Sequence, residues 1–334
     1  MRNLILTAAV AALSTIAVAP QEVLASDFPE RRIQISFPWA AGSPAYVLSQ
    51  IIADGMTAEL GVDIAVVSKP GAGGVNAFMA GLAEPADGYT IIDGWVAPLM
   101  ISPMFDKADY EYDDVIPLHS AGAVALAVVS RADEDRWTDF PSFVEYLREN
   151  PGETRFTGSE ELTLPHLVAT SMLMDQGLVS RNVPYVGLAP GVKDLRGGLL
   201  DWMLVNAGSY KANKDHLRVL AVLSDNAEAA GVYDGAPMIG DFGVDLGLTG
   251  LAPMSWNWWV VKADTPDDVV DRLRSAMAAS LENPDVQQKI RDLGFLPSGY
   301  SADEYAAVAG QIDAELRGAM EAVQWLRDEL KALQ

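Results

Sequence analysis

The feature that most constrains this chain is a glycine-rich loop at residues 69–76, between a strand-like run and a helix-like run. Residues 62–68 read as a buried strand, and residues 75–83 form an apolar segment with helical character. Glycines let backbone N–H groups approach a ligand closely, and a following helix N-terminus attracts anions. The loop can therefore hold a carboxylate or phosphate without a charged side chain, although a plain strand–helix turn explains the same residues. It has neither the Walker sequence nor the spacing of a dinucleotide site.

Strands and helices alternate along the first part of the chain. The helix expected at residues 45–60 has Pro44 at its first turn and Gly61 just past its end, which are favoured positions for both residues. The alternation favours an α/β fold with a parallel sheet, in which ligands bind beyond the carboxyl ends of the strands. The strands expected here lie at 32–37, 62–68 and 90–94, which places the loops 38–44, 69–76 and 94–98 on one rim.

A second series of elements follows without a Pro/Gly/Ser-rich linker. The length of 334 residues is enough for two domains with separate cores. We therefore expect two lobes, 26–123 plus 251–334 and 124–250, that share the chain through crossovers near 120–127 and 248–256. Two further strands are expected at 115–119 and 124–129. The second series then comprises helices at 140–149 and 164–175 and strands at 183–185, 201–205 and 217–223, and the chain returns as a strand at 256–261.

The first 25 residues resemble a secretory signal, with Arg2, an apolar stretch at 4–18 and a cleavage-like end at Ala25. The alternative is an uncleaved membrane anchor, for which the stretch is short. We expect cleavage near Ala25 and an exported, periplasmic protein. The net charge of −23 disfavours binding to nucleic acid or anionic membranes. The absence of cysteine excludes disulfides, thiol catalysis and Cys-type zinc sites.

No residue pattern in the chain predicts catalysis. The histidines His119, His166 and His216 are far apart in sequence and lack metal-ligand spacing, and no G-x-S-x-G nucleophile elbow occurs. We therefore expect neither an enzyme nor a metal or cofactor. Two aromatic residues, Trp39 and Trp95, follow predicted strands directly, so each is a candidate for ligand binding or for packing at the rim.

Several stretches together resemble the substrate-binding proteins of tripartite tricarboxylate transporters, the Bug family. The most specific are residues 69–74 (KPGAGG) and 86–90 (ADGYT), and the resemblance extends over nearly the whole mature chain. It implies a type II periplasmic-binding-protein fold, with two α/β lobes that close on a small carboxylate and deliver it to membrane transporter subunits. A monomer is expected. Weaker agreement lies at 158–159, 166–167, 183–187, 217–222, 265–266 and 283–286.

The resemblance also implies a binding site. In the family, two loops of the first lobe hold a ligand carboxylate through backbone amides and ordered water, and they correspond here to 39–46 and 72–76. The ligand-binding residues implied are Trp39, Ala40, Gly42, Ser43, Tyr46, Ala72, Gly73, Gly74, Asn76 and Trp95 in the first lobe and Ser159, Thr163, His166, Tyr185 and Asn206 in the second.

The chain departs from the family at four of these places. Tyr46 stands where an Asp is usual, Ser43 replaces a Gly, Val205 replaces a common Asp, and Trp95 replaces a small hydroxyl residue. Large aromatic residues thus replace polar groups that could meet a second carboxylate. We expect a monocarboxylate with an apolar or aromatic body. The alternatives are a di- or tricarboxylate binder and a periplasmic adaptor that presents a carboxylate to a membrane kinase.

Overall fold

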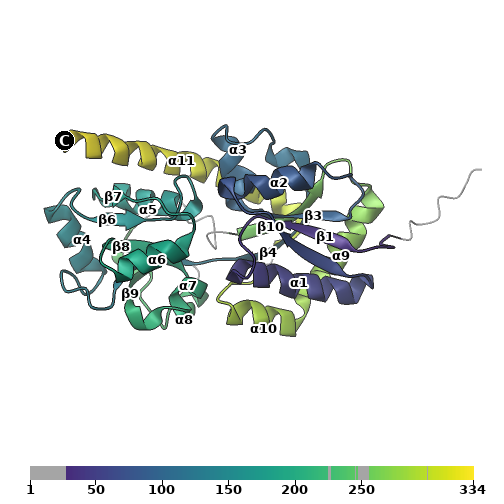
Figure 1. Cartoon of the computed structure of the whole chain (residues 1–334), viewed down its shortest axis with the longest axis horizontal. Helices are drawn as coiled ribbons and strands as arrows, with labels where there is room; N and C mark the ends of the chain where they lie inside the picture. Colours follow the sequence, from purple (N-terminus) through teal and green to yellow (C-terminus); the bar gives the residue numbers. More distant parts are fainter. Residues whose placement is uncertain (1–27, 225–226, 245, 247–255, 299) are drawn as a thin grey trace, which may run out of the picture.

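The computed structural model describes residues 28–334 except 225–226, 245, 247–255 and 299. The predicted signal segment and most of the second predicted crossover therefore lie outside the described residues. Those described form two α/β lobes side by side (Figure 1), each built on one five-stranded sheet. The strand orders are β2-β1-β3-β10-β4 and β7-β6-β8-β5-β9. The predicted two-lobed α/β fold is thus confirmed.

The first lobe combines the beginning and the end of the described chain. Helices α1, α9 and α10 pack together near β2 and β4, and α2 packs near β1 and β3. Its strands are β1 (Ile33–Phe37), β2 (Ile64–Ser68), β3 (Thr90–Trp95), β4 (Val115–Ala123) and β10 (Trp256–Lys262). Its α-helices are α1 (Pro44–Leu60), α2 (Val75–Leu82), α3 (Ser102–Met104), α9 (Asp267–Glu282), α10 (Pro284–Asp292) and α11 (Tyr305–Ala332), and Ala97–Ile101 forms a π-helical turn.

The second lobe uses the middle of the chain. Alternate residues of β5 separate its two faces: Leu126 and Val128 join one buried cluster, whereas Ala127 and Val129 join another. Its strands are β5 (Leu126–Arg131), β6 (Arg155–Thr157), β7 (Arg181–Asn182), β8 (Trp202–Asn206) and β9 (Leu217–Leu223). Its helices are α4 (Phe140–Glu149), α5 (Leu164–Asp175), α6 (Leu188–Arg196), α7 (Ala207–Lys211) and α8 (Glu228–Val232).

Three sequence expectations need correction. The sheets are mixed, because β10 runs antiparallel to β3 and β4, and β5 runs antiparallel to β8 and β9. The strand expected at 183–185 is displaced to β7, where Arg181 and Asn182 pair with β6. The segment 94–98, expected to be a loop, contains the end of β3 and the start of the π-helical turn. The end of β3 pairs with β10, and the residues of the π-helical turn are buried.

Two connections join the lobes in the described structure. The first is the short crossover at Val124 and Ala125, between the end of β4 and the start of β5. The second is α11, which begins beside the first lobe and extends along the second (Figure 1). Its first residue, Tyr305, contacts Trp258 of β10, and further along the helix packs against α5. One buried apolar cluster consequently contains residues of both sheets and of α11.

Candidate ligand-binding site

The registers of the two sheets place the predicted rim of the first lobe, and the end of β8 in the second lobe, at the crossover end of the lobes. In the first sheet, the last residues of β1 and β2, Phe37 and Ser68, are paired, and Trp95 at the end of β3 pairs with Asn257. Asn257 in turn pairs with Gly122, one residue before the end of β4. In the second sheet, Asn206 pairs with Leu126, the first residue after the crossover. The loops that follow these strand ends therefore lie near the junction of the two lobes.

The glycine-rich loop has an unusual backbone conformation. Gly71, Ala72, Gly73 and Gly74 all have positive φ, of 118°, 49°, 62° and 96°. Positive φ is strained for residues that carry a Cβ, which explains the three glycines. A Cβ on Gly74 would also lie 2.9 Å from Pro98 Cγ and 3.0 Å from Pro38 Cβ, so glycine is required sterically. In the described part of the chain no side chain caps α2, although the first amide of the helix, Val75 N–H, donates to the carbonyl oxygen of Ala72. A helix that starts without a side-chain cap favours an anion near its N-terminus.

One polar side chain of this loop is engaged within the loop itself. Asn76 is exposed and donates from Nδ2 to the carbonyl oxygen of Pro70 at 3.1 Å. This bond closes the loop and fixes its shape. Ala72 is exposed and Gly73 is half-buried, so their backbone groups are accessible at the surface of the first lobe.

The loop between β1 and α1 is held by its own hydrogen bonds. Ser43 Oγ accepts the Tyr46 N–H at 3.2 Å and caps α1, and Ser68 Oγ donates to the Trp39 carbonyl at 2.5 Å. Gly42 has a φ of 80°, and both Ala40 and Gly42 are exposed. Trp39 is half-buried against the core. The structure thus brings this loop beside the glycine-rich loop, because β1 and β2 are neighbours.

Tyr46 and Trp95 are more enclosed than their positions in the sequence suggest. The ring of Tyr46 packs edge-on against Phe37, and its hydroxyl donates to the Val66 carbonyl at 3.1 Å. Trp95 is 5% exposed and packs against Phe295. Its indole Nε1 is buried and finds no hydrogen-bond partner among the described residues. These rings are therefore part of the packed rim, and Trp95 retains an unused donor.

In the second lobe, the loop between β6 and α5 holds three predicted residues. Ser159 has a φ of 74°, and Thr163 Oγ1 donates to the carbonyls of Gly158 at 3.0 Å and Glu160 at 2.8 Å. His166 is buried, and its Nδ1 accepts the Leu162 N–H at 3.3 Å. Burial lowers the pKa of His166 to about 4, so the imidazole is neutral at pH 7.

Tyr185 and Asn206 both follow this loop in the sequence, and they serve different local roles. Tyr185 N–H donates to the Ser159 carbonyl at 3.3 Å, and its hydroxyl donates to Asp194 Oδ2 at 2.7 Å. That bond to the Asp194 carboxylate raises the pKa of Tyr185. Asn206 Oδ1 accepts the Ser209 N–H at 2.9 Å and caps α7.

The lobes touch where the N-termini of α1 and α7 meet. A Cβ on Gly208 would lie 2.7 Å from Pro44 Cγ and 3.1 Å from Pro44 Cβ, so only glycine fits. Close by, a Cβ on Gly294 would lie 2.5 Å from Ala207 Cβ, and Lys211 Nζ donates to the Asp292 carbonyl at 3.1 Å. Sequence reasoning did not identify Pro44 and Gly208 as an inter-lobe contact, because no local pattern marks a contact between residues so far apart.

A family model described as "Tripartite tricarboxylate transporter family receptor" matches residues 48–319, which is most of the chain. The chain belongs to this family. The predicted resemblance is therefore confirmed, and the protein is a solute-binding receptor of a family of periplasmic receptors.

Similar proteins extend over nearly the whole receptor. A UPF0065 protein of Pseudomonas sp., encoded in the tcbD-tcbE intergenic region, is 26% identical, over 89% of this chain and 87% of that protein. An R. palustris structure with adipate is 23% identical, with a TM-score of 0.76 over 88% of this chain and 98% of that one. The MatC structure from Rhodopseudomonas palustris with bound malate is 18% identical, with a TM-score of 0.70 over 91% and 100%. These structural likenesses support the fold.

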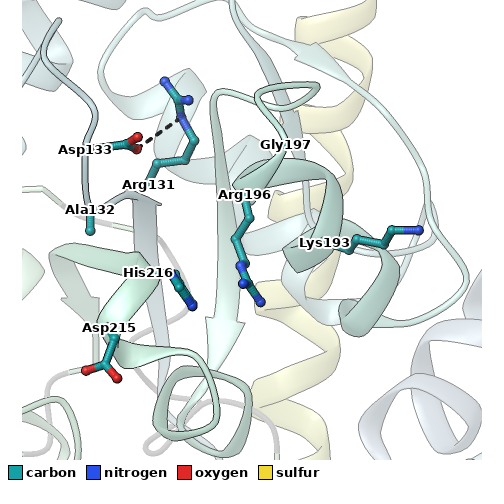
Figure 2. Close-up of a pocket in the computed structure, with 8 residues that line it drawn as sticks. All are labelled: Arg131, Ala132, Asp133, Lys193, Arg196, Gly197, Asp215 and His216. Carbon is teal, nitrogen blue, oxygen red and sulfur yellow. Dashed lines mark ion pairs between the residues drawn. The ribbon is translucent and has the colours of Figure 1, made fainter.

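Two cavities of the receptor lie away from the predicted site. One of about 560 Å³ in the second lobe is lined by Arg131, Lys193, Arg196 and His216 among others (Figure 2). Arg131 ends β5 at the end opposite the crossover, and it pairs with Asp133 at 3.8 Å. Lys193 points away from Arg196 and His216 in Figure 2, so these three side chains do not converge on one point. The other cavity, of about 230 Å³, lies beside β1 and β3 and includes Arg31 and Tyr89.

Two further searches of the described residues gave no candidate. Within them, no helix combines the length and apolarity needed to cross a membrane. The same residues contain no group of three or more His, Cys, Asp or Glu side chains placed to hold a metal ion.

Proposed function

We propose that this receptor captures a small organic carboxylate between its lobes and delivers it to the membrane subunits of a tripartite tricarboxylate-type transporter. The first lobe comprises 26–123 plus 251–334 and the second 124–250, with α11 packed across both. The lobes close on the ligand by a hinge motion at the crossovers. The ligand-binding set is the one that the sequence predicts, from Trp39 to Asn206.

The observation that carries the proposal is the loop at Gly71–Gly74 with the uncapped start of α2. The four consecutive residues of this loop all have positive φ angles, and no side chain among the described residues caps the start of α2. The positive end of a helix dipole, together with the exposed backbone of Ala72 and the half-buried backbone of Gly73, can bind a carboxylate without a cationic side chain. The loop lies at the end of the first lobe near the crossover, so the second lobe can cover a ligand held there.

The ligand that we propose has one carboxylate and an apolar or aromatic body. Trp39 is half-buried and offers aromatic surface at the rim, which Trp95 packs from within. Contact of a ligand with an aromatic ring contributes roughly 0.5–1.5 kcal/mol beyond area burial. A dicarboxylate with an apolar middle is the second candidate. It is favoured by Trp95 Nε1, which is buried without a hydrogen-bond partner among the described residues and would donate to a distal oxygen of a ligand that reaches it. Adipate and malate accompany two structures of similar fold.

A thermal-shift panel tests the proposal directly. A ligand that binds only the folded state raises its stability by about 2.7 kcal/mol at one hundred times Kd. Adipate, hexanoate, benzoate, succinate, malate and citrate would be compared at one pH and ionic strength. Stabilisation by at least one acid supports carboxylate capture, and no response to a broad acid panel contradicts it.

Calorimetry then separates the two ligand classes. Hexanoate and adipate have the same carbon chain and differ by one carboxylate, so their comparison isolates the second anionic group. Tighter binding of hexanoate or benzoate than of succinate, malate or citrate supports the monocarboxylate class, and Trp95→Ser should reduce that preference. Tight citrate binding without any response to an aromatic monoacid contradicts it.

A further inference from the structure

A carboxylate is buried in the first lobe directly behind the N-terminal turns of α1. Asp93 of β3 is fully buried, and its two oxygens have different partners. Oδ1 accepts from Asn257 Nδ2 of β10 at 2.8 Å, and Oδ2 accepts from Ser49 Oγ of α1. An acidic residue inside the apolar run TIIDGW of β3 is unusual for a buried strand, because desolvation of a carboxylate is costly.

The hydrogen bonds determine which oxygen can carry a proton. Asn257 Oδ1 accepts the Gly122 N–H at 3.0 Å, so its amide is fixed with Nδ2 toward Asp93. Oδ1 of Asp93 must therefore remain an acceptor. Oδ2 faces a hydroxyl that can reverse its role, because Ser49 Oγ is also 3.2 Å from the Ala45 carbonyl. A proton on Oδ2 can donate to Ser49 Oγ while Ser49 donates to Ala45, without loss of any hydrogen bond on this path.

The electrostatic surroundings leave this carboxylate sensitive to an added charge. Ser49 of α1 and Asn257 and Trp259 of β10 are the polar side chains near it, and no ionised group among the described residues contributes to its pKa. Strand β1, helix α2 and the π-helical turn contain no titratable side chain, and the acids of α1, Asp54 and Glu59, are exposed. Burial raises the pKa of Asp93 to about 6, against the lowering effect of its hydrogen bonds.

Ser49 and Ala45 connect Asp93 to the proposed ligand site. Ala45 is the second residue of α1, and Ser49 lies four residues further along the helix, which is a rise of about 6 Å. An anion bound at the loops 39–46 and 72–76 would therefore lie beyond the N-terminal turn of α1. Part of the protein interior would separate this anion from the Asp93 carboxylate. In such an interior like charges repel more strongly than in water, and closure of the lobes removes water that would screen them.

We propose that Asp93 takes up a proton on Oδ2 when the receptor binds its anionic ligand, so that ligand capture is coupled to protonation. The inference rests on the proposed function, because it requires an anion at the junction of the lobes. Asp93 is a positioning residue in this scheme: it does not touch the ligand but sets its affinity through its charge. The proton comes from solvent, and one is bound for each ligand when uptake is complete.

Calorimetry on the full mature receptor measures this coupling. We would titrate whichever of adipate and benzoate binds more tightly, at pH 7 in phosphate and in Tris, whose ionisation enthalpies differ. The difference between the two apparent enthalpies gives the number of protons taken up. We expect a positive fraction of a proton and, for a pKa rise of about one unit on binding, about five- to tenfold tighter binding at pH 5.5 than at pH 8.

Two variants assign the proton to its residue. Asp93→Asn has the same size and can donate to Ser49 and accept from Asn257, so it mimics the protonated state and should lose both the uptake and the pH dependence. Asp54→Asn, an exposed acid on the same helix, should behave as the wild type. If Asp93→Asn does not fold, Ser49→Ala serves instead. This variant removes one hydrogen-bond donor to the Asp93 carboxylate, so the affinity should change over a higher pH range than in the wild type.

The remaining outcomes refute either the inference about Asp93 alone or the proposed function together with it. Proton uptake that persists in Asp93→Asn and disappears in His166→Asn assigns the proton to His166 and refutes the inference. Affinity that varies less than twofold between pH 5.5 and 8, with no proton uptake, refutes it as well while leaving carboxylate capture intact. If no acid of the wider panel binds at any pH, the proposed function fails and the inference fails with it.

Discussion

The contact between Pro44 and Gly208 offers a way to hold the lobes apart without altering either binding loop. Gly208 lies in α7 and does not have a positive φ, so alanine suits its backbone and improves helix propensity. The added Cβ would approach Pro44 Cγ to 2.7 Å, whereas carbon atoms normally lie about 3.5–4.0 Å apart. One lobe must therefore move by about 1 Å, or the backbone must deform.

The expected magnitude follows from the cost of overpacking. Forcing an extra methyl group into a close-packed contact typically costs about 1–3 kcal/mol. In Gly208→Ala only the arrangement in which the lobes touch carries this cost, because separated lobes leave the methyl group in solvent. If that arrangement is the ligand-bound one, the affinity should fall by roughly 5- to 150-fold.

The assay compares two Gly→Ala variants. Gly231→Ala in α8 is the matched control, because Gly231 is exposed, does not have a positive φ, and a Cβ there would meet nothing within 4 Å. Calorimetry with the tightest-binding acid gives the affinities, urea unfolding checks that both variants are folded, and X-ray scattering reports compactness. Gly208→Ala with wild-type affinity and an unchanged scattering profile would show that this contact plays no part in ligand capture.

Three further predictions address the binding loop, the buried histidine and the long C-terminal helix. Gly73→Val introduces a β-branched residue at a φ of 62° and should weaken carboxylate binding at least about tenfold by calorimetry; a folded variant with unchanged affinity would exclude a role for this backbone. His166 has a lowered pKa, so the unfolded chain binds more protons between about pH 4 and 6.5 and stability is lost as pH falls through that window, by roughly 3 kcal/mol in total. His166→Asn should reduce that loss in urea titrations relative to the wild type, and an identical pH profile would contradict the assignment. Leu326→Ala in α11 should cost about 2–5 kcal/mol because this side chain is buried, whereas Arg327→Ala breaks only an exposed pair with Glu161 and should cost less than about 1 kcal/mol; equal effects in urea unfolding would refute the burial argument.

The sequence by itself determined many of the local elements of this fold. Pro44 and Gly61 predict the bounds of α1 to within one residue, because terminal prolines and C-terminal glycines act on backbone groups within one turn. The glycines at 71, 73 and 74 likewise permit positive φ wherever the loop lies in the fold. Both signals depend on neighbours only a few residues away, so the backbone conformation of this loop could be anticipated from the sequence, and its binding of an anion stays a prediction. The motif pair at 69–74 and 86–90 indicated the family.

The tertiary structure alone decided how these parts meet. The apolar stripe of α11 does not show which lobe it covers, and only packing against α5 places its later turns on the second lobe. Strand direction was equally hidden, because β10 pairs antiparallel with strands that precede it by more than a hundred residues. The same holds for the contact of Pro44 with Gly208 and for the bonds of Asp93 to Ser49 and Asn257. Such contacts depend on the relative positions of distant segments, which the pattern of residues along one segment does not contain.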